Sequence, residues 1–319
     1  MFVPLYLILF FALELIYFKL ATRYNITDEP NHRSSHHTTI IRGGGIIFPI
    51  GVLLNAIISG FGYPYFIAGL IIISSISLYD DFKPRSNILR ILCHLLAVSL
   101  MFFESGLFAQ SPIVIISAYV IVIGTINAYN FMDGINGLTV AYSLVSISSL
   151  IYVNETGTYF IESDWLITTA ITLVVFGFFN FRSTAKSFAG DVGSISMAFI
   201  LIYFLILLIL TTGEVKYIGL FLLYGLDTVT TIIFRLIRRE NIFLAHRSHF
   251  YQFLVNSKLW PHTIVSLIYG VLQLIINIFI LTVKLDLMSF LSLLVVAGCV
   301  VIAMRFQVEG KAALINENK

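Results

Sequence analysis

The stretch FAGDVGSISMAFILIYFLILLIL, residues 188–210, consists of a short polar segment followed by an apolar run. A helix needs about 20 mainly apolar residues to cross a bilayer, and the run lies within a predicted span over residues 194–211. The polar segment, Gly190-Asp191-Val192-Gly193-Ser194, stands immediately before the run. Because the start of a helix carries partial positive charge and free backbone amides, it attracts phosphate. The stretch therefore predicts a membrane-spanning helix that begins at a polar site.

The composition of the whole chain supports a membrane protein. Of its 319 residues, 58% are hydrophobic and 11% are charged, and the mean hydropathy is +0.94, whereas a soluble domain has roughly 25% charged residues. The apolar runs are too long for the alternating strands of a membrane barrel. We therefore predict an all-α integral membrane protein, a single domain over residues 1–319, with ten or eleven transmembrane helices. The predicted spans are residues 2–20, 46–62, 64–80, 88–104, 112–130, 136–153, 165–181, 194–211, 216–237, 262–283 and 286–304.

The lysines and arginines fall almost entirely on one side of these spans. Of the 19 such residues, all except Lys216 and Lys284 lie on the same side, and basic residues mark the cytoplasmic side of a membrane protein. We therefore predict an N-terminus outside and a C-terminus in the cytoplasm. The predicted cytoplasmic loops lie near residues 21–45, 80–87, 127–137, 182–194 and 238–261.

Seven polar clusters interrupt the apolar chain, and every one lies on the predicted cytoplasmic side. They occupy residues 30–45, 80–83, 127–137, 179–182, 186–194, 238–239 and 246–249. Carboxylates, amides, imidazoles and glycines gathered on one face predict a polar site at a membrane surface.

Two adjacent carboxylates, Asp80 and Asp81, end the third predicted span. Neighbouring side chains on a helix point about 100° apart, so the two can serve different partners. One would hold a hard cation, which prefers oxygen ligands, and the other would accept a proton or pair with a base. The alternative is a charge cluster that closes the helix before Pro84.

The segment 127–137 carries amides at helical spacing. Asn127, Asn130 and Gly134 recur at i, i+3 and i+7, which places them on one face of a helix end. Lipid offers amides no partner, so we predict that this face belongs to the site. The alternative is a helical hairpin whose amides join neighbouring helices.

Asp191 has two interpretations. It can hold a metal ion beside Lys186 and the flanking glycines, or it can simply cap the helix that follows. Capping requires neither the glycines nor the upstream lysine, so the sequence favours a site for phosphate and a cation.

The loop His246-Arg247-Ser248-His249 offers donors for an anion. Two histidines without a cysteine are a weak zinc signal, whereas Arg247 can bind a phosphate through two hydrogen bonds. The alternative is a basic loop that binds anionic lipid headgroups.

Two acids lie inside predicted spans. Asp227, about 16 Å along its helix from Arg238, is expected to face the interior of the bundle, with Thr228 and Thr230 as hydrogen-bond partners. Glu14 has no polar neighbours in the sequence and receives no role.

Three motifs together resemble those of the polyprenyl-phosphate N-acetylhexosamine-1-phosphate transferases (glycosyltransferase family 4), which include phospho-N-acetylmuramoyl-pentapeptide transferase. They are Asp-Asp-x-Lys at 80–83, Asn-x-x-Asn-x-x-Asp-Gly-x-x-Gly at 127–137 and Ala-Lys-x-Phe-x-Gly-Asp-x-Gly-Ser at 185–194. Residues 33–36, 42–45 and 246–252 resemble the lipopolysaccharide and O-antigen branch rather than the peptidoglycan branch. Thr38, Ile40 and Ile41 depart from the Lys, Thr and Pro of many relatives, which leaves Arg42 to provide the basic contact.

The resemblance implies an enzyme of the bacterial inner membrane with its active site on the cytoplasmic face. It would transfer N-acetylhexosamine 1-phosphate from a UDP-sugar, with UDP-N-acetylglucosamine as first choice, to polyprenyl (undecaprenyl) phosphate and release UMP. Mg²⁺ is the implied cofactor, with Mn²⁺ as an alternative ion, and no nucleic acid is expected as a partner. The implied catalytic residues and metal ligands are Asp80, Asp81 and Asp191. The implied substrate-binding residues are Arg42, Lys83, Asn127, Asn130, Asp133, Asn136, Lys186, His246, Arg247 and His249.

A transporter or flippase of lipid-linked sugars is the alternative from another class, with Asp227 as its intramembrane acid. Transporters commonly have two repeated halves, and the sequence contains no such repeat. The CDP-alcohol phosphotransferases would need several aspartates around an Asp-Gly, and Asp133-Gly134 has no such companions. The identity of the sugar, the pathway, the formation of a homodimer and the choice between direct displacement and a phospho-enzyme stay open.

Overall fold

The computed structural model describes residues 3–29, 39–83, 87–242 and 246–316. Its α-helices are α1 (Val3–Arg23), α2 (Ile47–Ile58), α3 (Pro64–Phe82), α4 (Asn87–Ser105), α5 (Pro112–Met132), α6 (Leu138–Thr156), α7 (Ser163–Asn180), α8 (Gly190–Thr212), α9 (Leu222–Ile237), α10 (Phe250–Asn256), α11 (His262–Thr282), α12 (Leu287–Glu309) and α13 (Lys311–Ile315). The short 3₁₀ helices are η1 (Gly44–Ile46), η2 (Leu107–Ala109) and η3 (Val215–Phe221). One small antiparallel pair, β1 (Thr27–Asp28) and β2 (Ile40–Ile41), joins them. The predicted all-α class is confirmed for the described residues.

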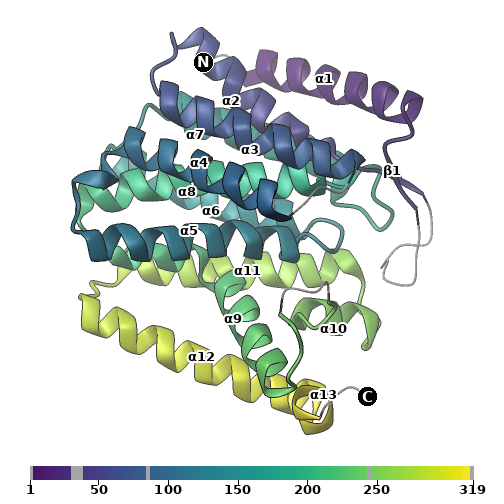
Figure 1. Cartoon of the computed structure of the whole chain (residues 1–319), viewed down its shortest axis with the longest axis vertical. Coiled ribbons are helices and arrows are strands. Elements are labelled where there is room, and N and C mark those ends of the chain that lie inside the picture. The colour runs from purple at the N-terminus through teal and green to yellow at the C-terminus, as the bar shows by residue number, and fades with distance from the viewer. Residues whose placement is uncertain (1–2, 30–38, 84–86, 243–245, 317–319) are drawn as a thin grey trace.

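Most of the long helices run side by side along one direction, so the bundle has two ends (Figure 1). At one of them, on the right of Figure 1 beside β1 and α10, helices α3, α5 and α7 end and α8 begins. We call this the polar end, because the polar motifs of the sequence meet there. Hydrogen bonds join the last residues of those three helices to residues 187–194, as described below.

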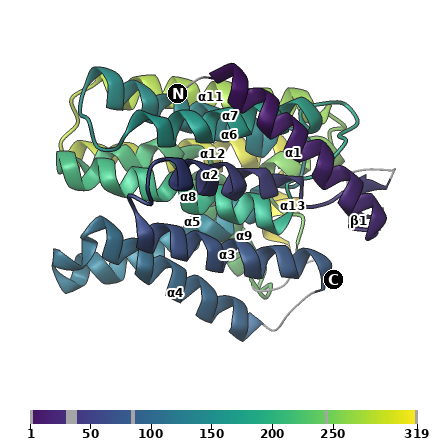
Figure 2. The same cartoon turned by 90° about the horizontal axis from the view of Figure 1, so that it is seen from above.

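Helix α8 forms the centre of the bundle. In its most apolar part 89% of the residues are buried, and α2, α3, α5 and α6 surround it (Figure 2). A helix that is apolar all round belongs in such an interior. By contrast, only 11% of the corresponding part of α1 and 6% of that of α12 are buried, so these helices offer their leucines and isoleucines to lipid.

Nine helical segments within the described residues are long and apolar enough to cross a membrane. Ten of the eleven predicted spans coincide with one α-helix each, and the ninth coincides with η3 and α9 together. However, α2 has only 12 residues, and α6, with 19, is not among the nine. α6 is less apolar because it carries Ser143, Ser146 and Ser149 on buried positions. By length and composition alone, nine segments of the described residues are therefore candidate spans, and the exact number of spans stays a prediction.

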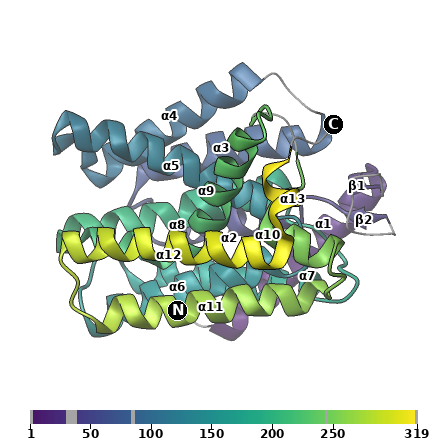
Figure 3. The same cartoon turned by 90° about the horizontal axis from the view of Figure 1, so that it is seen from below.

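The ninth predicted span, residues 216–237, is not one continuous α-helix. It begins as η3 and becomes α9 at Leu222, and α9 then runs steeply across α11 and α12 (Figures 1 and 3). Backbone groups freed inside a membrane need partners within the protein. Gln273 supplies two of them: its Oε1 accepts from the Leu223 N–H (2.9 Å) and its Nε2 donates to the Gly219 oxygen (3.1 Å). The break is thus stabilised by a side chain of α11, which no local pattern in residues 216–237 indicates.

Candidate active site

Glycines let the segment before α2 lie directly against the start of α8. The Gly45 N–H donates to the Ala189 oxygen (3.1 Å), and a Cβ at Gly45 would lie 2.4 Å from the Cα of Gly193. Gly190 has a φ of +72°, and a Cβ there would lie 2.6 Å from Asp81 Oδ2. The glycines on both sides of this contact are therefore required by close approach of two backbones.

Asp81, at the end of α3, caps the N-terminus of α8. Its Oδ1 accepts from the N–H of Asp191 (2.9 Å) and its Oδ2 from the N–H of Val192 (3.0 Å). Arg42 Nε donates to the same Oδ1 at 2.7 Å, and the Asp81 side chain is fully buried. The positive helix start and the guanidinium together stabilise a carboxylate that has left water. In this structure the Asp81 carboxylate therefore binds the backbone N–H groups at the start of α8, which the sequence predicts as a phosphate site.

Asp191 does not cap α8. The helix has Ala189 as its N-cap, without a side-chain hydrogen bond, and Asp191 is the second residue of the helix. The capping interpretation is therefore wrong, because Asp81 caps the helix from α3. The Asp191 side chain is 22% exposed, and its Oδ1 lies 3.4 Å from Arg42 Nη2. It is a carboxylate at the surface of the site.

Asp80 and Asp81 have different partners, as their helical spacing predicts. Asp80 Oδ2 lies 3.7 Å from Arg90 Nε on α4, and the Asp80 side chain is buried. The side chains of Lys83 and Lys186 are exposed at the rim of the polar end. Asp80 therefore belongs to the contact between α3 and α4, whereas Asp81 faces α8.

The three asparagines of segment 127–137 have three different environments. Asn130 Oδ1 accepts from Ser194 Oγ (2.8 Å), one turn inside α8, so Asn130 joins the site. Asn127 Nδ2 donates to a backbone oxygen of its own helix (2.8 Å). Asn136 is buried, and its Nδ2 donates to two backbone oxygens after α7 (3.0 Å each). Asn136 thus joins neighbouring helices, as the alternative interpretation of this segment expects.

Asp133 follows α5 and lies within electrostatic range of the other carboxylates. Its Oδ1 accepts from Thr139 Oγ1 at 2.5 Å. Burial raises the pKa of Asp133 to about 7; the hydrogen bond from Thr139 opposes this shift, and the charges of Asp191 and Asp81 add to it. Asp133, Asp81 and Asp191 therefore form one electrostatic group around the start of α8.

A second polar cluster surrounds Asp227 on α9. Asp227 Oδ1 lies 3.1 Å from His249 Nδ1 and accepts from the Phe250 N–H (3.0 Å), the first residue of α10. The Tyr269 hydroxyl donates to Oδ2 at 2.6 Å, and Thr231 Oγ1 donates to Oδ1 at 3.2 Å. Asp227 thus caps α10 from another helix, as Asp81 caps α8.

The predicted environment of Asp227 is only partly right. The side chain is buried at 3% exposure, as expected, but its carboxylate is bonded by other residues than Thr228 and Thr230. Thr230 Oγ1 donates to backbone oxygens of α9 instead. Because the break before α9 tilts this helix, its first turns face the loop that leads into α10, and the partners of Asp227 come from there.

His246 and Phe131 connect the second cluster to the first. The rings of His246 and His249 stack with their centroids 5.0 Å apart, and the Phe131 ring lies 5.9 Å from that of His246. The Tyr251 hydroxyl donates to the Phe131 oxygen (2.8 Å). Burial and the neighbouring His249 lower the pKa of His246 to about 4. The predicted loop therefore lies against the end of α5, next to Asn130 and Asp133.

Some predicted residues have no structural test. Residues 33–36, which entered the family resemblance, and Thr38 lie outside the described part of the chain. Arg247 is half-buried beside His246, and its role as an anion clamp stays a prediction.

Sequence reasoning missed several residues that complete the site. Ser194 and Thr139 bond Asn130 and Asp133, and Arg90 approaches Asp80. Ser194 is the last residue of the motif at 185–194, so the sequence indicated its place near the site. Arg90 and Thr139 had none, because their partners depend on how the helices pack.

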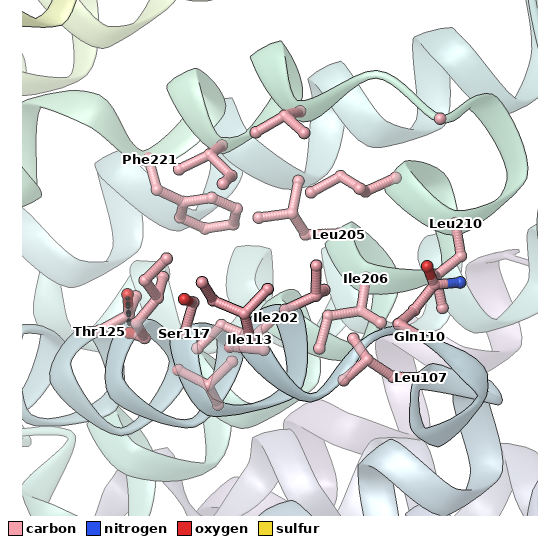
Figure 4. A pocket seen from close by; sticks show the side chains of 18 residues that line it. Leu107, Gln110, Ile113, Ser117, Thr125, Ile202, Leu205, Ile206, Leu210 and Phe221 are labelled. Atoms are coloured by element: carbon pink, nitrogen blue, oxygen red, sulfur yellow. Dashed lines mark hydrogen bonds between the residues drawn. The ribbon is translucent and has the colours of Figure 1, made fainter. Parts of the chain in front are cut away.

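An apolar cavity of about 450 Å³ lies between α5, α8 and η3 (Figure 4). Its walls are almost wholly aliphatic, with Gln110, Ser117 and Thr125 as polar exceptions. The Thr125 hydroxyl is bonded to its own helix (2.8 Å). The cavity therefore offers contacts to an apolar group and little to a charged one.

Comparison with known proteins identifies a family and two proteins that this chain resembles. Residues 63–209 match the model of glycosyl transferase family 4. The chain is similar to this family over that segment. It is 27% identical over 278 residues to a probable undecaprenyl-phosphate N-acetylglucosaminyl 1-phosphate transferase of Bacillus subtilis (strain 168), covering 79% of this chain and 75% of that protein. It is also 27% identical over 209 residues to an undecaprenyl-phosphate alpha-N-acetylglucosaminyl 1-phosphate transferase of Yersinia pestis, covering 59% of this chain and 57% of that protein.

The superfamily predicted from the motifs is therefore confirmed. The family 4 segment contains Asp81, Asn130 and Asp191, whereas Arg42 and His249 lie outside it. The structure joins these outer residues to the family segment through hydrogen bonds and ring contacts.

Proposed function

We propose that the protein transfers N-acetylhexosamine 1-phosphate from a UDP-N-acetylhexosamine to polyprenyl phosphate, and that UDP-N-acetylglucosamine is the donor. An oxygen of the lipid phosphate attacks the β-phosphorus of the donor, the bond from that phosphorus to UMP breaks, and a sugar-diphospho-polyprenol remains in the membrane. This product would start a cell-surface polysaccharide. The names of the two relatives and the family 4 match support the reaction class.

The observation that carries the proposal is the arrangement of Arg42, Asp81 and Asp191 at the start of α8. Two anionic reactants must meet, so the site must screen negative charge. Arg42 brings a guanidinium to the surface of the site, where its Nη2 is 3.4 Å from Asp191. Asp81 holds that arginine in place through a 2.7 Å ion pair and keeps the helix start fixed.

Asp191 fits the predicted Mg²⁺ site best. No group of three or more His, Cys, Asp or Glu able to hold a metal ion occurs among the described residues. That suits Mg²⁺, which proteins usually bind through one or two carboxylates together with substrate phosphates. Asp191 is partly exposed, whereas the oxygens of Asp81 already accept three hydrogen bonds. When bound there, Mg²⁺ would neutralise charge that develops on the diphosphate.

Asn130 and Asp133 lie beside this centre and suit the sugar or nucleotide. The amide oxygen of Asn130 accepts a hydrogen bond from Ser194, and the Nδ2 of the same amide is the donor that we assign to the ligand. Asp133, with its pKa raised to about 7 by burial, can accept or donate a hydrogen bond near neutral pH. Asp80 would serve the lipid phosphate through Arg90, its neighbour on α4.

The apolar cavity supports an acceptor with a long hydrocarbon chain. It lies between membrane-spanning helices α5 and α8, where an isoprenoid chain would exchange contacts with lipid tails for close packing against aliphatic side chains. The proposed orientation puts the polar end in the cytoplasm, where UDP-sugars are made available to the enzyme.

The test is an assay of the purified protein with a panel of radiolabelled UDP-sugars, polyprenyl phosphate and Mg²⁺. Label should move into an organic-extractable lipid with stoichiometric release of UMP, and UDP-N-acetylglucosamine should be the best donor. Reactions without polyprenyl phosphate provide the control. Label that crosses vesicle membranes without UMP release would instead support the transporter.

A further inference from the structure

Asp227 is a buried carboxylate whose hydrogen-bond donors, apart from Thr231 of its own helix, come from two other parts of the chain. One is the segment 249–251, with the ring of His249 and the N–H groups that open α10, and the other is the Tyr269 hydroxyl of α11. An acid in a membrane-spanning helix is costly and usually has a functional partner. The partner that carries chemistry here is His249.

His249 is held at both its backbone and its ring. Its N–H donates to Gln252 Oε1 (3.3 Å), and its Nδ1 lies 3.1 Å from Asp227 Oδ1. A carboxylate accepts only, so Nδ1 carries the hydrogen and the ring orientation is fixed. The remaining nitrogen, Nε2, points away from Asp227.

The Nε2 of His249 is buried and has no hydrogen-bond partner among the described residues. Such orphaned nitrogens are rare and call for an explanation. One face of the ring is covered by His246, which is half-buried and stacked at 5.0 Å. A hydrogen bond to Nε2 lies in the plane of the ring, and because Nδ1 carries the hydrogen, Nε2 is its acceptor.

We propose that Asp227 is a positioning residue for the transfer reaction: it orients His249 so that Nε2 accepts a hydrogen bond from a hydroxyl or amide N–H of the UDP-N-acetylhexosamine. This inference rests on the proposed function. Arg305 of α12 supports the same loop, since its Nη2 donates to the Ser248 oxygen (2.8 Å). The loop before α10 is thus fixed from α9 and α12, on the side away from the reactants.

A double-mutant cycle tests the inference. Asp227→Asn, His249→Ala and the double variant are compared with the wild type for UMP release, with kcat and KM for the donor measured separately. The asparagine keeps an oxygen for the Phe250 N–H, but its amide group offers a donor toward Nδ1 and favours the wrong tautomer. We expect Asp227→Asn to reduce turnover about 10- to 100-fold, as loss of an orienting partner commonly does. In the His249→Ala background, Asp227→Asn should reduce turnover by less than a further factor of about two, because both changes remove the same interaction.

Tyr269→Phe is the matched control. It removes a 2.6 Å hydrogen bond to the same carboxylate without touching His249, so it should lower the melting temperature and leave turnover within about twofold of the wild type. If Asp227→Asn does not fold, Asp227→Glu, which keeps the charge but displaces it, goes through the same cycle.

The outcomes separate the two proposals. Costs that multiply in the double variant, or wild-type turnover in Asp227→Asn, overturn the positioning role and leave the proposed function intact. A wild-type protein that releases no UMP from any UDP-sugar overturns the proposed function, and the positioning role with it.

Discussion

The starts of α8 and α10 resemble each other in construction and differ in what they leave exposed. Each is capped by a carboxylate from another helix, Asp81 for α8 and Asp227 for α10. At α8 the second helical residue is Asp191, which is partly exposed and approaches Arg42. At α10 the second residue is Tyr251, which is fully buried.

The same structural device thus serves two purposes. The first N–H groups of a helix have no acceptor within the helix, and lipid offers none. A carboxylate from another helix accepts their hydrogen bonds. At α8 the filled start carries an additional charge toward the reactants. At α10 the carboxylate of Asp227 orients His249 and accepts from the N–H of Phe250. The predictions below change one side of this comparison at a time.

The largest effect should come from Asp191→Asn. Asparagine keeps the size of the side chain, and Asp191 is not a cap, so the melting temperature should stay that of the wild type. Transfer should fall by about 100- to 1000-fold, the usual cost of removing one group that stabilises developing charge. UMP release across a Mg²⁺ titration measures it, and a partial recovery at high Mg²⁺ is expected.

Asp286→Asn is the control for that change. Asp286 caps α12 with its own side chain, accepting from the Ser289 N–H (2.9 Å), and asparagine caps about equally well. It should alter neither transfer nor melting. Normal transfer by Asp191→Asn would show that the charge at the second position of α8 is dispensable, and would remove the contrast with α10.

Asp81→Asn should act mainly through stability. It removes the charge that pairs with Arg42 at 2.7 Å and leaves a buried amide to cap α8. Charge-assisted hydrogen bonds contribute about 1.5–3 kcal/mol each, so the free energy of unfolding should fall by about that amount. Transfer per folded molecule should also fall, because Arg42 loses its anchor.

Glu104→Gln separates capping from chemistry. Glu104 caps α3 from α4 at the opposite end of the bundle, accepting from the Tyr65 N–H at 2.6 Å. Its loss should reduce stability without reducing transfer per folded molecule. If Asp81→Asn behaves in the same way, Asp81 is a structural cap and nothing else.

The arginines next to the two caps should respond differently to lysine. Arg42→Lys loses the fork that contacts both Asp81 and Asp191, so transfer should fall about tenfold, equivalent to about 1.4 kcal/mol. Arg305 donates to Thr231 (2.8 Å) and to the Ser248 oxygen (2.8 Å) and is buried. Arg305→Lys should therefore lower the melting temperature more than it lowers transfer. Thermal unfolding and UMP release on the same preparations decide between these patterns.

The sequence predicted the helices better than the contacts between them. The apolar runs placed α3, α5 and α8 because about 20 apolar residues in a row have few alternatives. The motifs also identified Asp81, Asn130 and Asp191 as members of one site, and the structure brings these three residues together at the polar end.

What the sequence could not supply depends on packing across the bundle. A trans-helix cap such as Asp81 leaves no local pattern, so capping of α8 by its own Asp191 stayed an alternative interpretation of the sequence. Asn136 entered the predicted substrate-binding residues through the family resemblance, and in the structure its Nδ2 donates to two backbone oxygens after α7. The tilt of α9 follows from Gln273, about 50 residues away in the sequence, and the tilt in turn selects the partners of Asp227.

The smallest effect concerns Asp133, which lies between the two capped helices. Its pKa in the folded protein is raised to about 7 by burial, from an ordinary value of 3.8. Between those two values the folded state keeps a proton that the unfolded chain has lost, so stability falls as the pH rises from about 4 to about 7 and then levels off. Asp133→Asn lacks that proton, and it should therefore gain melting temperature over the wild type as the pH increases through this window, with no gain at pH 4. Thermal unfolding at intervals from pH 4 to pH 8, without substrate or Mg²⁺, measures this difference in melting temperature. If the difference does not change with pH, Asp133 is already ionised in the folded protein over the whole of this pH range.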